Sequence, residues 1–241
     1  VEPAASIPAK SYRRTQALDT HLEGIALDVE PGITVPLLLL RPQTAGNARL
    51  PVAVIVSQDG KERILGQRTR EVEALLSAGV AVCLPDVRGT GETSPDPRRG
   101  TSSAEVSLAA TELMLGNTLL GARLKDLRAV LSYLRSRGDV DARRIALWGE
   151  SFAPANPERL VPDEVVNWQI GPEIQHQAEP LGGLLAILGG LFDENVRAVA
   201  VRGGLSCYLS ILEDRFAYVP KDIIVPGIVD AGDISDVVAA L

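Results

Sequence analysis

The stretch Arg144-Ile-Ala-Leu-Trp-Gly-Glu-Ser-Phe-Ala153 is the most informative part of the sequence. Residues 144–148 form a predicted strand, because the apolar run that follows Arg144 is typical of a buried strand. Gly149 and Ala153 then stand two positions before and two after Ser151, a near match to the pattern G-x-S-x-G. A strand that turns sharply at a serine needs small residues there, because larger side chains would collide with neighbouring backbone. The pattern predicts that Ser151 lies on a tight turn, where its hydroxyl can act as a nucleophile.

The residue after the serine also has a predicted role. We expect the turn to lead into a helix that starts here, and Pro154 is compatible with this because the first turn of a helix tolerates proline. The backbone N–H of Phe152 would then face the negative charge that develops on a reacting carbonyl oxygen. A serine after a strand is also a common helix N-cap, and this remains the alternative for Ser151.

The rest of the chain alternates apolar runs with helical patterns, which favours an α/β fold with a mainly parallel sheet and helices on both faces. We predict an N-terminal arm over residues 1–19 and one domain over 20–241, with a loop-rich insertion at about 154–179. The predicted strands are 21–29, 33–41, 51–56, 80–84, 144–148 and 196–201. The predicted helices are 68–78, 120–134, 180–192, 205–213 and 235–241.

The strongest helical pattern has leucines that step by four and three residues, so that they form one apolar stripe. Gly138 is expected to end this helix in a left-handed conformation. The stripe consists of Leu120, Leu124, Leu127, Leu131 and Leu134, and the polar residues predicted to lie off it are Arg123, Asp126, Arg128 and Arg135.

Composition excludes several functions. The chain has 24 basic and 31 acidic side chains, a net charge of −7, and no basic cluster that would bind nucleic acid. Its longest apolar runs, such as Val35 to Leu40, are too short to span a membrane. Two histidines and two cysteines are too few for a zinc site, so we expect no metal. Cys83 and Cys207 are expected to be buried free thiols. The start of the sequence fits either a cytoplasmic protein or an exported one whose signal has been removed, and the oligomeric state stays open.

A second motif, Asp86-Val-Arg-Gly-Thr-Gly-Glu-Thr-Ser94, follows the strand at 80–84. Together with the turn at Ser151, it resembles the α/β-hydrolase superfamily, in which a D-x-R-G-x-G-x-S-like loop precedes the nucleophile. Within that superfamily the chain resembles the acetyl xylan esterase-like bacterial esterases and their dienelactone-hydrolase and prolyl-oligopeptidase-type relatives. The resemblance covers roughly residues 33–241.

This resemblance implies an α/β-hydrolase fold that is present through about six of its strands. It also implies a serine ester hydrolase of acetyl esterase or acetyl xylan esterase type, which forms an acyl-enzyme on Ser151 and needs no cofactor. The substrate would be a small-molecule or carbohydrate ester. A second oxyanion donor is expected from the loop Ser57-Gln58-Asp59-Gly60, either the N–H of Gln58 or that of Asp59.

The acid and base of the catalytic triad are harder to place. The superfamily order is Ser, then Asp or Glu, then His, and His176 is the only histidine after Ser151. It lies inside the predicted insertion, where it is either a relocated base or a solvent-facing side chain. Among the acids, Asp230, Asp233 and Asp236 are expected to be loop and helix-capping carboxylates, and the pair Glu213-Asp214 is a weaker candidate.

Three explanations fit the lack of a clear acid and base. The sequence is part of a longer hydrolase whose acid and base lie beyond Leu241; or it uses His176; or it is a catalytically silent, hydrolase-like binding module. We favour the first, because an uncovered strand at 196–201 would be a long hydrophobic sheet edge. A serine peptidase of prolyl-oligopeptidase type is a further alternative, since it shares both motifs.

Overall fold

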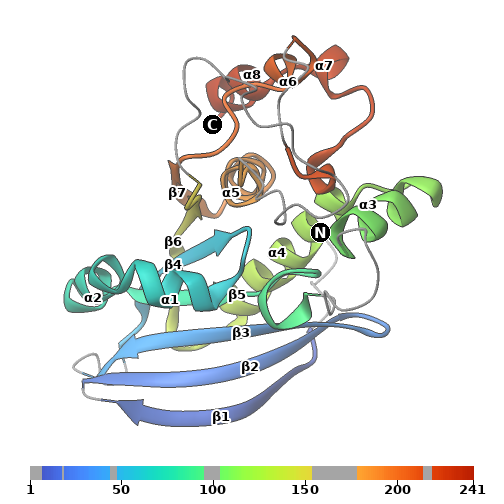
Figure 1. Cartoon of the computed structure of the whole chain (residues 1–241). Coiled ribbons are helices and arrows are strands. Elements are labelled where there is room, and N and C mark those ends of the chain that lie inside the picture. The colour runs from blue at the N-terminus through green and yellow to red at the C-terminus, as the bar shows by residue number, and fades with distance from the viewer. Residues whose placement is uncertain (1–6, 18, 44–47, 95–103, 154–177, 214–218) are drawn as a thin grey trace.

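A computed structural model of the chain describes residues 7–17, 19–43, 48–94, 104–153, 178–213 and 219–241. Seven strands in these ranges form one mixed sheet (Figure 1). No helix among the described residues is long and apolar enough to cross a membrane.

Three strands form the antiparallel half of the sheet: β1 (Ala9–Ala17), β2 (Thr20–Glu30) and β3 (Ile33–Pro42). The turn between β2 and β3 uses Gly32 at a φ of 80°, a backbone conformation that glycine adopts without a steric penalty. Residues 9–17 were predicted to belong to an arm, and they form β1 instead. Their polar, solvent-exposed side chains give no apolar alternation, because β1 is an edge strand that backbone pairing and exposed side-chain contacts, such as the ion pair of Arg14 with Glu23, hold to β2.

The other four strands are parallel to one another: β4 (Leu50–Ser57), β5 (Ala81–Pro85), β6 (Val140–Glu150) and β7 (Val196–Arg202). The strand order is β1-β2-β3-β5-β4-β6-β7, and β3 joins the two halves by pairing antiparallel with β5. All predicted strands are therefore confirmed. The strand β6 starts earlier than predicted, because the buried Val140 already pairs with Leu50 of β4. A register irregularity separates this pair from the continuous pairing that begins at Ile145.

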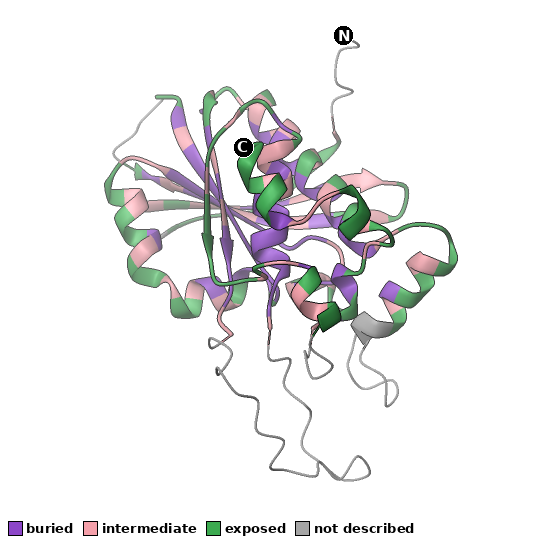
Figure 2. Ribbon diagram, turned by 90° about the horizontal axis from the view of Figure 1, so that it is seen from above, coloured by how far each residue is buried: buried purple, intermediate pink, exposed green. Residues whose placement is uncertain are grey.

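Helices cover both faces of the sheet. One face carries α1 (Lys61–Gln67) and α2 (Thr69–Ser77), and the other carries α4 (Leu119–Ser136) and α5 (Leu181–Leu191). Side chains of a strand alternate between faces, so in β4 Ile55 packs in the α1/α2 core while its neighbours Val54 and Val56 pack in the α4/α5 core. Figure 2 shows that α5 is buried along most of its length, which fits its sequence of Gly, Leu, Ala and Ile.

The helix α4 has the predicted apolar stripe but differs from the prediction at two polar positions. Arg123 and Asp126 were predicted to lie off the stripe, and both side chains are fully buried. They face the loops at the carboxyl edge of the sheet, where each has an oppositely charged partner. The helix ends at Arg137 in an extended conformation, so Gly138 does not provide a left-handed stop.

The C-terminal part of the chain caps its short helices with carboxylates. Asp233 accepts a hydrogen bond from the N–H of Ile234 at the start of α8 (Ile234–Ala239), and Asp236 accepts one from the N–H of Asp233. The predicted capping role of these two residues is confirmed. The remaining helical segments are η2 (Gly91–Thr93), α3 (Ala104–Met114), α6 (Leu209–Glu213), η3 (Lys221–Ile223) and α7 (Ile228–Ala231).

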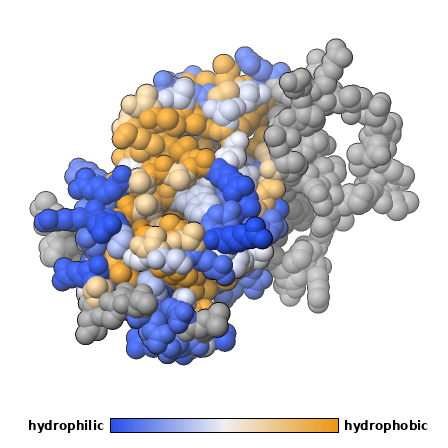
Figure 3. Space-filling model, turned by 90° about the vertical axis from the view of Figure 1, so that its left-hand side faces the viewer, coloured by the Kyte–Doolittle hydropathy of each residue, from blue (hydrophilic) through white to orange (hydrophobic). Residues whose placement is uncertain are grey.

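The strand β7 lies at one edge of the sheet and pairs, among the described residues, with β6 alone. The side of the molecule that carries it shows a broad apolar area (Figure 3). An open groove of about 420 Å³ lies along the strand, lined mainly by Val196, Ala198, Val199, Val201, Val238 and Leu241.

Candidate active site

Ser151 lies directly after β6, between the ends of the two neighbouring strands. Its N–H donates to the carbonyl of Arg202 at the end of β7, at 2.9 Å. Gly203 has a φ of 70°, and a Cβ added there would lie 2.9 Å from the Cβ of Ser151. Glycine is therefore required both by the backbone conformation and by the space beside the serine. The exposed fraction of Ser151 is 7%, so the serine is held at a largely enclosed position.

The small residue before the serine allows α5 to approach β6 closely. A Cβ added to Gly149 would lie 2.2 Å from the carbonyl oxygen of Gly182, and one added to Gly182 would lie 2.5 Å from that of Glu150. The backbones of strand end and helix start are in direct contact here. This contact explains the predicted requirement for a small residue at position 149.

The predicted helix start at Phe152 is wrong. Residues 151–153 are not helical, and the helix that packs behind the serine, α5, begins only at Leu181. The predicted insertion at 154–179 separates the turn from this helix in sequence. Its residues 154–177, including His176, lie outside the described part of the chain.

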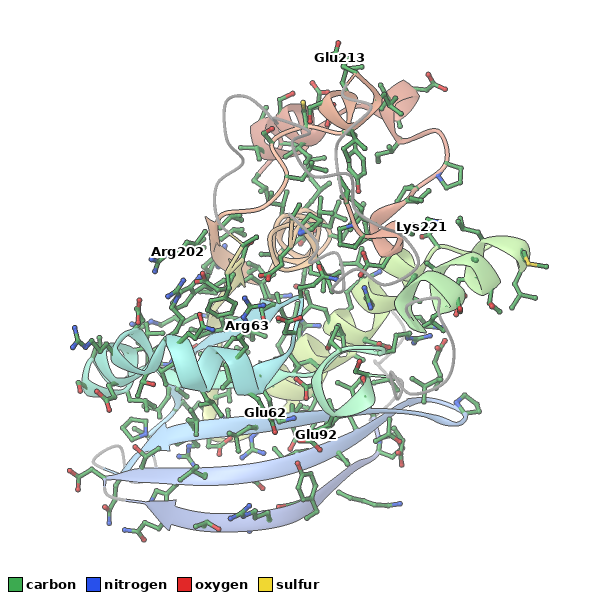
Figure 4. The ribbon with its side chains drawn as sticks, in the orientation of Figure 1. Glu62, Arg63, Glu92, Arg202, Glu213 and Lys221 are labelled. Carbon is green, nitrogen blue, oxygen red and sulfur yellow. The ribbon has the colours of Figure 1, made fainter. Side chains whose placement is uncertain are left out.

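The backbone N–H of Phe152 nevertheless binds a negatively charged oxygen. It donates to Oε2 of Glu179 at 2.6 Å, and Oε1 of the same carboxylate accepts from Nη1 of Arg63, also at 2.6 Å. Glu179 immediately precedes the N-cap of α5, and Arg63 extends from α1 toward that helix (Figure 4). Residues from three separate segments thus meet beside Ser151.

Two guanidinium groups lie over the ring of Phe152. The central carbons of Arg63 and Arg68 each lie 4.8 Å from the ring centre. Arg68 also donates to Oε1 of the fully buried Glu150 at 2.8 Å, and this hydrogen bond raises the pKa of Arg68. The glutamate that precedes the serine is therefore paired with a cation.

The loop after β4 reaches the same region. The side chain of Gln58, 4% exposed, accepts from the N–H of Leu181 at 3.2 Å and donates to Oδ2 of Asp222 at 2.8 Å. Its neighbour Asp59 accepts a hydrogen bond from Arg63. The side chain of Gln58 is thus fixed between α5 and η3, while Asp59 lies beside the arginine that binds Glu179.

A buried ion pair stabilises the carboxylate that binds Gln58. Asp222 pairs with Arg123, and both side chains have an exposed fraction of 0%. Arg123 also donates from Nε to the carbonyl of Arg88 at 2.9 Å. Within the described residues Oδ1 of Asp222 has no hydrogen-bond partner. The pair joins α4, η3 and the loop that follows β5.

The motif Asp86-Val-Arg-Gly-Thr-Gly is built around the carboxylate of Asp86. This carboxylate accepts from the N–H and the ammonium group of Lys61, at 2.8 and 2.6 Å, and from the N–H of Glu92 at 2.9 Å. Gly60 and Gly91 have positive φ, and a Cβ on either would lie within 2.5 Å of the carboxylate. The motif therefore holds the loops after β4 and β5 together.

Arg88, the second charged residue of this motif, is held by two acids. It donates to both oxygens of Asp126 on α4, at 2.9 and 2.6 Å, and to Glu30 at 2.7 Å. The hydrogen bonds to Asp126 are the main reason that the pKa of Arg88 is raised. The burial of Asp126 is compensated by these hydrogen bonds, through which Asp126 positions the loop after β5.

The other predicted residues lie elsewhere. Glu213 is exposed at the end of α6, Asp214 lies outside the described residues, and Asp230 is exposed on α7. No group of three or more His, Cys, Asp or Glu side chains that could hold a metal occurs in the part of the chain that the structure describes.

Sequence reasoning missed Arg63, Arg68, Glu179 and Asp222. Their role depends on partners far along the chain: Glu179 is 116 positions from Arg63, and Asp222 is 164 from Gln58. One signal was present for Arg63, since it follows the predicted oxyanion loop within a single helical turn.

Comparison with known proteins supports the architecture. No protein-family model matches the chain, and no curated protein matches it significantly. Among solved structures, a protein of Bacteroides fragilis NCTC 9343 that is proposed to be an acetyl xylan esterase aligns over 98% of this chain, with a TM-score of 0.73 and 18% identity. The chain has the α/β-hydrolase fold.

Two further structures with this fold are similar over a smaller part of the chain. Acetyl xylan esterase 1 from Thermoanaerobacterium sp. JW/SL YS485 aligns over 82% of the chain at a TM-score of 0.51 and 16% identity. An acetyl xylan esterase from Paenibacillus sp. R4 aligns over 80% at 0.50 and 18%. The alignments cover 60%, 51% and 52% of the three neighbours, so this chain spans little more than half of their length. The alignment with the Bacteroides fragilis protein over nearly the whole chain confirms the predicted fold.

Proposed function

We propose that this chain carries the nucleophile of a serine ester hydrolase of the acetyl esterase or acetyl xylan esterase type. Ser151 is the nucleophile, and the N–H of Phe152 is a donor to the oxyanion. The observation that carries the proposal is the 2.6 Å hydrogen bond from this N–H to a carboxylate oxygen, because it shows a donor beside Ser151 that binds a negatively charged oxygen. The names and fold of the esterase neighbours agree with this proposal.

In the proposed reaction Oγ of Ser151 attacks the acyl carbon and loses its proton to a base. The carbonyl electrons move to the acyl oxygen, which becomes an oxyanion held by backbone N–H groups. The bond to the alcohol then breaks, the base returns its proton to the leaving oxygen, and water releases the acid from Ser151 by the same route. The second donor is proposed to be the N–H of Gln58 or of Asp59.

The base is proposed to be His176 or a histidine outside the 241-residue sequence. His21, the other histidine, lies on β2, where it pairs with Arg41 of β3 in the antiparallel half of the sheet. Among the described residues no histidine lies beside Ser151. This observation also favours the second candidate function, a catalytically silent, hydrolase-like binding module.

A fluorophosphonate probe and p-nitrophenyl acetate together test the proposal. We expect the probe to label Ser151, as located by peptide mass spectrometry, and Ser151→Ala to abolish both labelling and ester turnover. Because no histidine lies beside Ser151 among the described residues, turnover by the 241-residue chain is expected to be low. Equal turnover by the wild type and Ser151→Ala, above the uncatalysed rate, would refute the assignment of the nucleophile, and absence of labelling would favour the binding module.

A further inference from the structure

The N–H of Phe152 and the guanidinium of Arg63 bind the same carboxylate, one at each oxygen of Glu179. Both donors therefore point into one small volume beside Ser151. The inference below rests on the proposed function, because it concerns how this volume is used when an ester reacts.

Several contacts show that Arg63 is held in place. Its guanidinium lies over the ring of Phe152, it pairs with Asp59, and it belongs to α1, which begins directly after the predicted oxyanion loop. Burial disfavours its charged form, but the hydrogen bond to Asp59 and the charge of Glu179 outweigh burial and raise the pKa of Arg63. A charged, oriented donor is therefore present before any substrate binds.

Glu179 cannot remain in place while an ester reacts. Its exposed fraction is 9%, and its Oε2 accepts the hydrogen bond of the Phe152 N–H. In the proposed reaction this N–H binds the acyl oxygen instead. A carboxylate oxygen and the oxyanion of a tetrahedral intermediate are both negatively charged acceptors, so the donors that bind one also suit the other. A single N–H cannot serve both at short distance.

We propose that the Phe152 N–H and Arg63 together form the oxyanion site, and that Glu179 is its internal occupant. The acyl oxygen of the ester displaces the Glu179 carboxylate as Oγ of Ser151 bonds to the acyl carbon. Arg63 is then a catalytic donor that touches the oxyanion, and Glu179 competes with substrate for the site.

Binding of acetate tests the site without any need for turnover. The variant Glu179→Ala leaves both donors without their carboxylate, and acetate can fill the vacancy. We expect sodium acetate, compared with sodium chloride at equal ionic strength, to raise the Tm of Glu179→Ala by about 2–4 °C at concentrations well above its Kd. The wild type should show no such difference, because Glu179 already fills the site.

Two controls define the result. Glu62→Ala removes an exposed glutamate from the same helix as Arg63 and should respond to acetate as the wild type does. The double variant Glu179→Ala/Arg63→Met should lose the acetate response.

If Glu179→Ala does not fold, Glu179→Gln preserves the side-chain volume and should show a smaller rise in Tm with acetate. A rise that persists without Arg63, or no rise in either Glu179 variant, would overturn the proposal.

Kinetics supply an independent readout. Removing one oxyanion donor typically lowers kcat by about 100-fold or more, so we expect Arg63→Met to do this and Arg63→Lys to recover part of the loss. Glu179→Gln should raise kcat/KM for p-nitrophenyl acetate, because a neutral amide competes less well for the site. If Ser151-dependent turnover and fluorophosphonate labelling of Ser151 are both absent, the proposed function fails, while the acetate experiment still decides whether the anion site exists.

Discussion

The side-chain amide of Gln58 donates to the carboxylate of Asp222 at 2.8 Å, which joins the loop after β4 to a 3-10 helix near the C-terminus. The same carboxylate pairs with Arg123, whose side chain has an exposed fraction of 0%. One carboxylate therefore fixes both a predicted oxyanion loop and the central helix α4.

Replacing Asp222 should destabilise the protein strongly. Asp222→Ala leaves Arg123 buried without its anion, a change that typically costs about 3–5 kcal/mol in the free energy of unfolding. Asp222→Asn should cost less, because the amide oxygen can still accept from Gln58. Urea denaturation measures both. Lys221→Ala, at the exposed neighbouring position, is the control and should stay within about 0.5 kcal/mol of the wild type.

Gly203→Ala should impair both stability and the reactivity of Ser151. Its φ of 70° makes a side chain unfavourable by about 1–2 kcal/mol, and the new Cβ would push against Ser151. We expect a lower urea midpoint and slower fluorophosphonate labelling. Gly66→Ala is the matched control: this exposed helical glycine has nothing within 4 Å of an added Cβ, so alanine should stabilise the protein by about 0.5–1 kcal/mol. Unchanged labelling of Gly203→Ala would contradict the packing described here.

Asp233 should make stability depend on pH at the acid end. Hydrogen bonds from the backbone N–H of Tyr208, followed by those of Leu209 and Ile234, lower the pKa of Asp233 below its value in the unfolded chain. Its stabilising effect is thus fully present above the unfolded pKa of about 3.9 and is lost as pH falls through the folded pKa.

Asp233→Asn tests this prediction because asparagine caps helices about as well as aspartate but does not titrate. The wild type should exceed this variant in free energy of unfolding at pH 7, and the difference should shrink as the pH falls below about 4. A difference that stays constant across this range, measured by urea denaturation at each pH, would show that the charge of Asp233 contributes nothing.

The two cysteines should differ in reactivity. Cys83 lies inside β5 with an exposed fraction of 0%, and burial raises its pKa to about 12. Cys207 was predicted to be buried too, but it is partly exposed. With a thiol-reactive chromogenic disulfide, one thiol per native chain should react rapidly and the second only on unfolding. Cys207→Ala should abolish the rapid phase, and a rapid phase that survives this change would contradict the burial of Cys83.

The strands and the turn at Ser151 were predictable because their signals are local. An apolar run such as 51–56 needs only its own residues to indicate a buried strand, and a small residue at position 149 indicates a tight turn. The strand β1 was not predictable, since Ala9–Ala17 is polar and exposed and is held by backbone pairing to β2. A helix start at Phe152 was predicted wrongly, because residues 151–153 are not helical and the helix that packs behind the serine begins at Leu181.

The periodicity of apolar residues did not predict which charged side chains are buried. Arg123 and Asp126 have charged side chains beside an apolar stripe, and such residues usually face solvent. They are buried because Asp222 and Arg88, distant in sequence, meet them at the carboxyl edge of the sheet. Position 123 follows Leu120 by three residues, a spacing that places it near the apolar face of the helix.

The sequence by itself determined the α/β architecture, the strand that precedes Ser151 and the small residue that its turn needs, because these depend on neighbours within a few positions. Only the tertiary structure decided what surrounds the serine. It brings Arg63 from α1 and Glu179 from the start of α5 onto the N–H of Phe152. The physical reason is that ion pairs and hydrogen bonds depend on distance in space, and folding joins residues that no local pattern relates.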